Sequence, residues 1–137
     1  MREGVTLRAA VRADLIAHAR ADAPNECCGL LIGREGVIDG CVRARNLHPA
    51  PATRYILDPA IHIATRRQLR GTGREVIGCY HSHPAAAAVP SETDVAEAHY
   101  PEFVWLIVSL SDVRAPDIAA YRFDNGRFSP LAVVPAA

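Results

Sequence analysis

The chain has 137 residues, half of them hydrophobic, and this supports one globular domain over residues 1–137. Its 15 acidic and 15 basic residues balance to a formal net charge of zero, so neither a nucleic acid nor an anionic membrane is expected as a partner. All basic residues are arginines, and the absence of lysine excludes Schiff-base chemistry and a lysine general base.

The N-terminus and the cysteines indicate a cytoplasmic protein. Residues 1–10 carry charges and lack a long apolar core, so no signal peptide is expected. No apolar run reaches the roughly 18 residues that a membrane span requires. None of the four cysteines forms a Cys-x-x-Cys pair, and we expect buried, reduced thiols at Cys27, Cys28, Cys41 and Cys79.

The first half of the chain alternates short apolar runs with two helical patterns. A stripe of apolar residues predicts a first helix, which Pro24 ends. Two prolines mark residues 46–53 as a loop. The predicted elements are a strand over 5–7, a helix over 9–21, strands over 27–32, 37–44 and 55–57, and a helix from Pro59 to about Leu69.

The second half continues with a β-branched apolar strand over 75–82. The patterns that follow predict a helix over 91–99, a strand over 103–110, and a closing hairpin of strands 118–123 and 128–134. Asn125-Gly126 is a strong hairpin turn signal. This order of elements predicts an α+β (α/β layered) protein, in which helices flank a mixed sheet.

The segment HSHPAAAAVPSETD, residues 81–94, is the strongest functional signal. Residues two apart on a strand point to the same face, so His81 and His83 project side by side. Pro84 then ends the strand, because proline cannot continue a central ladder. Ser91 is a good N-cap for the following helix, and Asp94 then lies in its first turn.

Two histidines and one carboxylate can hold a metal ion and leave one position for water. Such an open site is typical of catalytic zinc, whereas structural zinc is closed by four protein ligands. An alternative for Ser91 and Asp94 is an ordinary capping box that satisfies backbone amides. Cys79 falls on the same face as the two histidines, so a thiolate as fourth ligand is a further alternative.

These residues resemble the JAMM (MPN+) zinc metallopeptidases. Their signature is a distant Glu, then His-Ser/Thr-His, seven residues, and Ser-x-x-Asp. Glu26, within NECCGLLIG at 25–33, matches the distant Glu, and the resemblance continues through 54–59 and 104–110. The short chain looks most like the bacterial stand-alone branch, which is similar to Mec-type hydrolases of small sulfur-carrier proteins.

The resemblance implies a fold, a metal and a reaction. The fold is a curved sheet between helices, of the cytidine-deaminase-like type, with the metal at one sheet edge. One Zn²⁺ per chain is held by His81, His83 and Asp94. Glu26 is the general base, and Ser91 donates a hydrogen bond to the oxyanion. The substrate is a small ubiquitin-like β-grasp carrier, cleaved after its C-terminal Gly-Gly, and we expect its extended tail to bind by strand addition at the sheet edge.

Two other function classes stay open at this stage. Two histidines and a carboxylate also form the facial triad of non-haem iron(II) oxygenases. A non-catalytic MPN-type interaction scaffold is the other alternative, although such scaffolds lack the ligands present here. The oligomeric state is open as well, a homodimer being one option.

Overall fold

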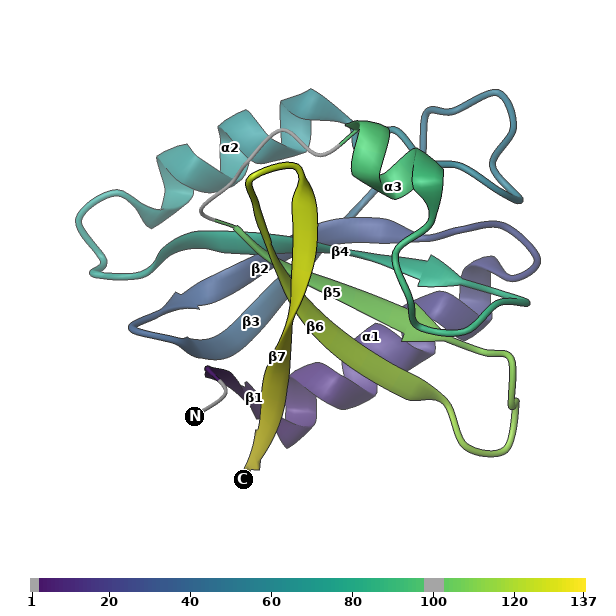
Figure 1. Cartoon of the computed structure of the whole chain (residues 1–137). Helices are drawn as coiled ribbons and strands as arrows, with labels where there is room; N and C mark the ends of the chain where they lie inside the picture. Colours follow the sequence, from purple (N-terminus) through teal and green to yellow (C-terminus); the bar gives the residue numbers. More distant parts are fainter. Residues whose placement is uncertain (1–2, 98–102) are drawn as a thin grey trace.

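The computed structural model describes residues 3–97 and 103–137, which form seven strands and three helices (Figure 1). In chain order these are β1 (Gly4–Arg8), α1 (Ala9–Asp22), β2 (Cys28–Arg34), β3 (Val37–Ala44), α2 (Pro59–Leu69), β4 (Glu75–His83), α3 (Glu92–Glu97), β5 (Val104–Ser109), β6 (Asp117–Asp124) and β7 (Arg127–Ala136). Within these residues, no helix is both long enough and apolar enough to cross a membrane.

The strands form one mixed sheet that closes on itself. Their order is β1-β3-β2-β4-β5-β6-β7, and β1 returns to pair in parallel with β7, from Gly4 opposite Ala132 to Arg8 opposite Ala136. This confirms the predicted curved, mixed sheet flanked by helices. The expectation of a metal site at a free sheet edge is wrong, because β4 pairs with β2 on one side and with β5 on the other.

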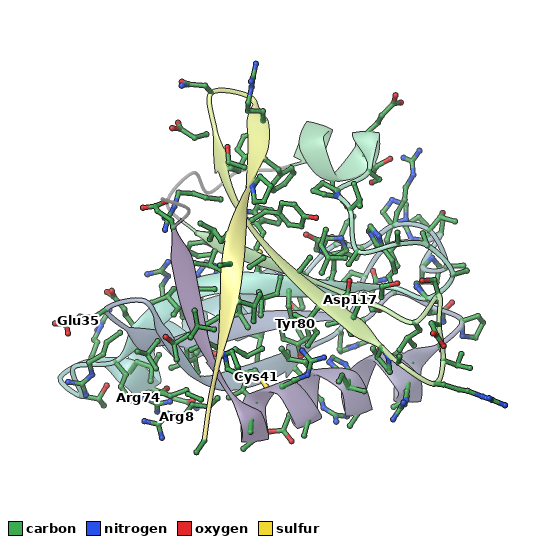
Figure 2. The ribbon with its side chains drawn as sticks, turned by 60° about the horizontal axis from the view of Figure 1, so that its bottom comes forward. Arg8, Glu35, Cys41, Arg74, Tyr80 and Asp117 are labelled. Carbon is green, nitrogen blue, oxygen red and sulfur yellow. The ribbon has the colours of Figure 1, made fainter. Side chains whose placement is uncertain are left out.

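The two faces of the sheet bury two separate apolar clusters. Neighbouring residues of a strand point to opposite faces. Tyr80 and Leu106 pack in the cluster between the sheet and α1. Cys79 and Trp105 pack in the smaller cluster on the opposite face, near α2. Figure 2 shows Tyr80 among the side chains between the sheet and α1. The same alternation therefore directs the odd-numbered residues at the end of β4 away from α1.

The Tyr80 side chain connects α1 to the middle of the sheet. Its hydroxyl lies 2.7 Å from Nδ1 of the buried His18, on α1. The ring lies over Gly29 of β2, where a Cβ atom would come within 2.5 Å of it. Glycine is therefore required at position 29. Tyr80 thus links β4 to α1 and packs on β2 directly before the first histidine of the cluster.

Most predicted elements are confirmed, with ends that differ by one or two residues, and three differences are larger or bear on the site. The strand predicted over 55–57 is wrong, because only a single bridge between Asn46 and Leu57 forms there. Strand β2 continues to Arg34, two residues beyond its predicted end, so only Glu35 and Gly36, both at positive φ, connect it to β3. The helix predicted over 91–99 is described as α3 up to Glu97, and its last two residues lie outside the described part of the chain.

Candidate metal centre

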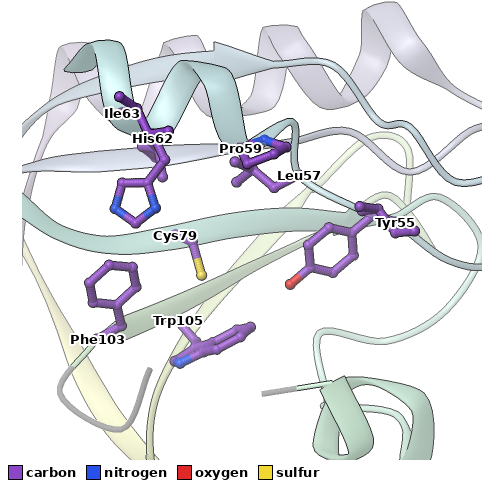
Figure 3. Close-up of a pocket in the computed structure, with 10 residues that line it drawn as sticks. Tyr55, Leu57, Pro59, His62, Ile63, Cys79, Phe103 and Trp105 are labelled. Carbon is purple, nitrogen blue, oxygen red and sulfur yellow. The ribbon is translucent and has the colours of Figure 1, made fainter. Parts of the chain in front are cut away.

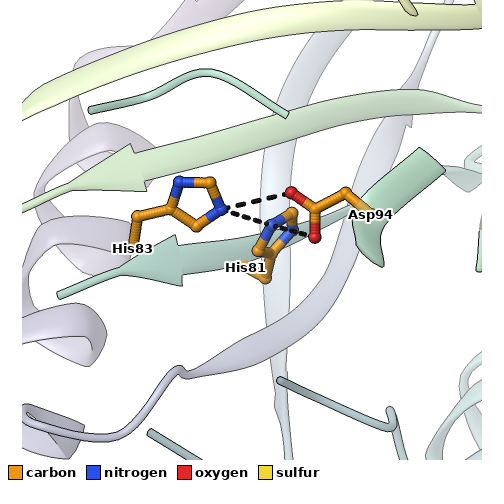
Figure 4. A group of neighbouring side chains, drawn as sticks. All are labelled: His81, His83 and Asp94. Carbon is orange, nitrogen blue, oxygen red and sulfur yellow. Dashed lines mark hydrogen bonds and ion pairs between the residues drawn. The ribbon is translucent and has the colours of Figure 1, made fainter. Parts of the chain in front are cut away.

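Three buried side chains converge at the end of β4 (Figure 4). His81 and His83 come from the strand, and Asp94 reaches them from the first turn of α3. The two Nε2 atoms lie 3.2 Å apart, and each is 3.2 Å from a different carboxylate oxygen of Asp94. The candidate ligand atoms of all three residues fall within 4.8 Å of one another. The spacing in the sequence thus predicts the observed cluster.

The protonation of the cluster suits a cation. Nδ1 of His83 lies 2.8 Å from the carbonyl oxygen of Ala87, which can only accept, so Nδ1 donates and the neutral ring keeps its lone pair on Nε2. Burial lowers the pKa of His81. Burial alone would raise the pKa of Asp94, but its contacts with the two histidines hold it well below its usual value. Two imidazole nitrogens and a carboxylate fit an open zinc site.

Asp94 is part of a capping box as well as of the cluster. The Ser91 N–H donates to Oδ2 of Asp94 at 2.8 Å, and the Asp94 N–H donates to Oγ of Ser91 at 3.0 Å. The two interpretations that the sequence left open are therefore compatible. The cap uses Ser91 Oγ as an acceptor, so the hydroxyl hydrogen remains available for a donor role.

Glu26 lies beside the cluster although it is 55 residues away from His81 in sequence. It precedes β2, whose first residue, Cys28, pairs directly with His81. Its side chain is buried, 6% exposed, unlike an ordinary loop glutamate. Burial alone would lower the pKa of His83, but contacts with Asp94 and Ala87 and the charge of Glu26 raise it. Glu26 is therefore near the cluster and is not one of its three members.

The serine between the two histidines explains how Glu26 comes to lie there. Ser82 points away from the cluster, and its Oγ accepts a hydrogen bond from the N–H of Cys27 at 2.8 Å. The Ser82 N–H donates in turn to the Cys27 carbonyl at 3.1 Å. This pair of bonds joins the strand of the histidines to the residue after Glu26.

Tyr55 is a residue of the site that the sequence analysis missed. Its ring stacks on His81, with centroids 4.5 Å apart and planes 21° from parallel. Nδ1 of His81 is buried and has no hydrogen-bond partner within residues 3–97 and 103–137. The stacked ring of Tyr55 therefore takes the orienting role that a hydrogen bond at the second nitrogen usually has.

We expect Tyr55→Ala to weaken zinc binding by about tenfold, since the loss of an orienting partner typically costs this much. Tyr55→Phe keeps the stacked ring and should bind zinc as the wild type does. Competition with a chromophoric chelator measures both affinities. Equal weakening in the two variants would show that the hydroxyl, and not the ring, supports the site.

An apolar cavity of about 660 Å³ adjoins Tyr55 between α2 and the sheet (Figure 3). Its other walls include Leu57, Cys79, Phe103 and Trp105. Cys79 lines this cavity and does not belong to the group of three ligands in the described structure. The alternative of a thiolate ligand at Cys79 thus has no support in the described structure.

The remaining described histidines have other partners. His18 bonds Tyr80, His62 accepts from Arg66, and Nδ1 of His48 accepts from the N–H of Ala50. None of these three histidines belongs to the cluster of candidate ligands in the described structure. His99, predicted at the end of the third helix, lies outside the described residues.

Comparison with known sequences identifies the family. The profile of the prokaryotic homologs of the JAB domain matches residues 8–124. The chain belongs to this family. Among its JAB relatives, a protein named CysO-cysteine peptidase from Mycobacterium tuberculosis is 34% identical over 98% of this chain and 97% of its own length. A protein named desampylase from Haloferax volcanii is 31% identical over 94% of each chain.

Solved structures agree with the JAB assignment. The solution structure of a protein from Desulfitobacterium hafniense superposes with a TM-score of 0.88 at 29% identity, covering 96% of this chain and 92% of that one. A JAB1/MPN domain protein from Archaeoglobus fulgidus shares the fold, with a TM-score of 0.60 at 21% identity over 96% and 98% of the two chains. The predicted JAMM/MPN fold and family are confirmed.

Proposed function

We propose that this JAB-family chain is a zinc-dependent peptidase or isopeptidase that cleaves after the C-terminal Gly-Gly of a small ubiquitin-like sulfur-carrier protein. The observation that carries the proposal is the convergence of three buried candidate ligands with a fourth buried side chain, the acid Glu26, beside them. The names of the peptidase and desampylase relatives support the same class of reaction.

His81, His83 and Asp94 would hold one zinc ion per chain. Bound there, zinc would polarise the scissile carbonyl and make a water molecule acidic enough to ionise near neutral pH. The three residues are suited to this because their ligand atoms lie within 4.8 Å of one another. Nδ1 of His83 donates to the Ala87 carbonyl, which leaves Nε2 of that ring for the metal. The ligand set leaves a position open for the reactants.

Glu26 and Ser91 supply the proton transfer and the hydrogen bond. Glu26 takes a proton from the attacking water and delivers it to the leaving amine, so that the carboxylate is regenerated. The hydroxyl of Ser91 donates to the carbonyl oxygen as that oxygen becomes negative, and such donors contribute about 3 kcal/mol. Its capping bond leaves the hydroxyl hydrogen free for this role.

The requirement for Gly-Gly follows from the crowding around the ligands. His81 is 1% exposed and Asp94 is 6% exposed, and Tyr55 covers one face of the His81 ring. A chain that passes this close to the ligands needs residues without side chains. The expected strand addition at a sheet edge cannot take place on β4, because β2 and β5 occupy both of its sides.

The proposal places the reaction in the cytoplasm, with no nucleic acid or membrane as partner. All four cysteines are free thiols, as a reducing compartment maintains them. Residues 1–137 act in this reaction as a single domain.

Intact mass spectrometry of a β-grasp carrier with a C-terminal extension after Gly-Gly tests the proposal. We expect the zinc-loaded protein to remove the extension, whereas the chelated protein leaves it in place. A carrier whose penultimate glycine is replaced by leucine is the matched control and should resist cleavage. Equal hydrolysis of that control, or of unrelated peptides, would favour a general peptidase instead. Turnover that depends on iron, oxygen and oxoglutarate would favour an oxygenase.

A further inference from the structure

Asn46, two residues after the end of β3, uses every hydrogen-bonding position of its side-chain amide. Nδ2 donates to the carbonyl oxygens of Glu26 and Arg54, both at 3.0 Å. Oδ1 accepts from the N–H groups of His48 at 3.0 Å and Ile56 at 3.1 Å. Two carbonyl oxygens face the nitrogen and two N–H groups face the oxygen, so the orientation of the amide is determined by its partners.

No other side chain satisfies these four partners at this length. Aspartate has no donor and would turn an oxygen toward two carbonyl oxygens. Glutamine has the same groups but is longer by one methylene. An asparagine that follows a strand is usually a turn residue, and its bond to the His48 N–H two residues on is of that kind. The bonds to Glu26 and Arg54 reach 20 and 8 residues away and require a different explanation.

The long-range bonds of Asn46 join two parts of the site. Asn46 holds the carbonyl of Glu26, and the N–H of Glu26 donates to the carbonyl of Pro51, in the same loop, at 2.7 Å. The other two long-range partners are Arg54 and Ile56, the residues on either side of Tyr55. The side-chain amide of Asn46 therefore fixes the backbone at Glu26, beside the cluster, and the backbone on both sides of Tyr55, whose ring stacks on His81.

We propose that Asn46 is a positioning residue for the reaction: it holds Glu26 at the distance and angle needed for proton transfer, and it holds Tyr55 against His81. This rests on the proposed function, in which Glu26 is the general base. Small displacements of a base lower the rate far more than they affect binding of the substrate. Asn46 itself acts only through the backbone of these two residues.

Asn46→Asp tests the positioning without any measurement of activity. It keeps the acceptor and removes both donors. The N–H of Leu47 donates to the Ile56 carbonyl at 2.9 Å and reports on the same segment. We expect amide hydrogen exchange at Glu26, Leu47 and Ile56 to accelerate by about tenfold or more, with β5 and β6 unchanged. Asn25→Asp is the matched control, since Asn25 is exposed beside Glu26 and gains the same charge without losing these bonds. Unchanged exchange at the three amides in Asn46→Asp overturns the proposal.

A double-mutant cycle tests the link to Glu26. In the wild-type background we expect Asn46→Asp to lower kcat for carrier cleavage by about tenfold, with KM within about twofold. In the Glu26→Gln background the same substitution should lower kcat by less than about twofold, because the base it positions is absent. A full additional loss in that background overturns the proposal, since it shows a general structural defect.

The two experiments separate the proposal from the function on which it rests. A zinc-loaded wild-type protein that leaves every carrier intact overturns the proposed function. The exchange measurement then still decides whether Asn46 holds the Glu26 and Tyr55 segments. Normal cleavage by the wild type with equal kcat in Asn46→Asp and Asn25→Asp retains the function and overturns the positioning role.

Discussion

Replacing Glu26 by glutamine is expected to lower the rate of carrier cleavage by about 100-fold or more. Glutamine has nearly the same shape as glutamate and keeps a hydrogen-bonding carbonyl, but it cannot take a proton from water. The ligands His81, His83 and Asp94 are untouched, so the variant should still bind one zinc per chain. Initial rates by intact mass spectrometry, together with metal analysis of the same sample, check both halves of the prediction.

Glu26→Asp is the matched control for this experiment. It keeps the carboxylate and withdraws it by one methylene, so its rate should fall between those of the wild type and Glu26→Gln. Near-normal turnover in Glu26→Gln would refute Glu26 as the base. A loss of zinc in Glu26→Gln would instead show that Glu26 contributes to metal binding.

The ligand cluster was predictable because its geometry is local. His81 and His83 share a strand face by alternation alone, and Asp94 follows within one loop and one helical turn. The proline at 84 and the N-cap at 91 mark where the strand ends and the helix begins. Local rules were therefore sufficient to place three side chains at one point.

Glu26 could be assigned only through the resemblance, and Tyr55 and Asn46 were missed. Glu26 meets the cluster because β2 pairs with β4, and no spacing in the sequence encodes that register. Tyr55 and Asn46 lie in a proline-rich loop shaped by the long-range bonds of one amide. The two prolines predict a loop there. The apolar residues at 55–57 led to the prediction of a strand, but only an isolated bridge forms at Leu57.

Closure of the sheet was beyond sequence reasoning for the same reason. It depends on β1 pairing with β7, which joins Gly4 to Ala132 at opposite ends of the chain. Both strands have ordinary apolar sequences, and neither sequence specifies the strand with which it pairs. The consequence is functional, because a closed sheet covers the edges that would otherwise accept another strand. The route of a substrate to the ligands must therefore avoid the flanks of β4.

Asp94→Ala is expected to abolish both zinc binding and activity. It removes the only anionic member of the cluster and leaves two imidazoles whose Nε2 atoms lie 3.2 Å apart. Loss of a residue that only orients a ligand costs up to about 100-fold in metal affinity, so loss of the ligand itself should cost more than about 100-fold. Metal analysis after gel filtration should find no stoichiometric zinc in Asp94→Ala.

Ser91→Ala separates the ligand role of Asp94 from its capping role. Asp94→Ala also removes the acceptor of the Ser91 N–H, which lies 2.8 Å from Oδ2 of Asp94. Ser91→Ala removes the other half of the same capping box and leaves the carboxylate in place. Retention of zinc by Ser91→Ala and its loss from Asp94→Ala would assign the effect to coordination. Equal loss of zinc from both variants would mean that the capping box, by ordering the start of α3, is what maintains the site.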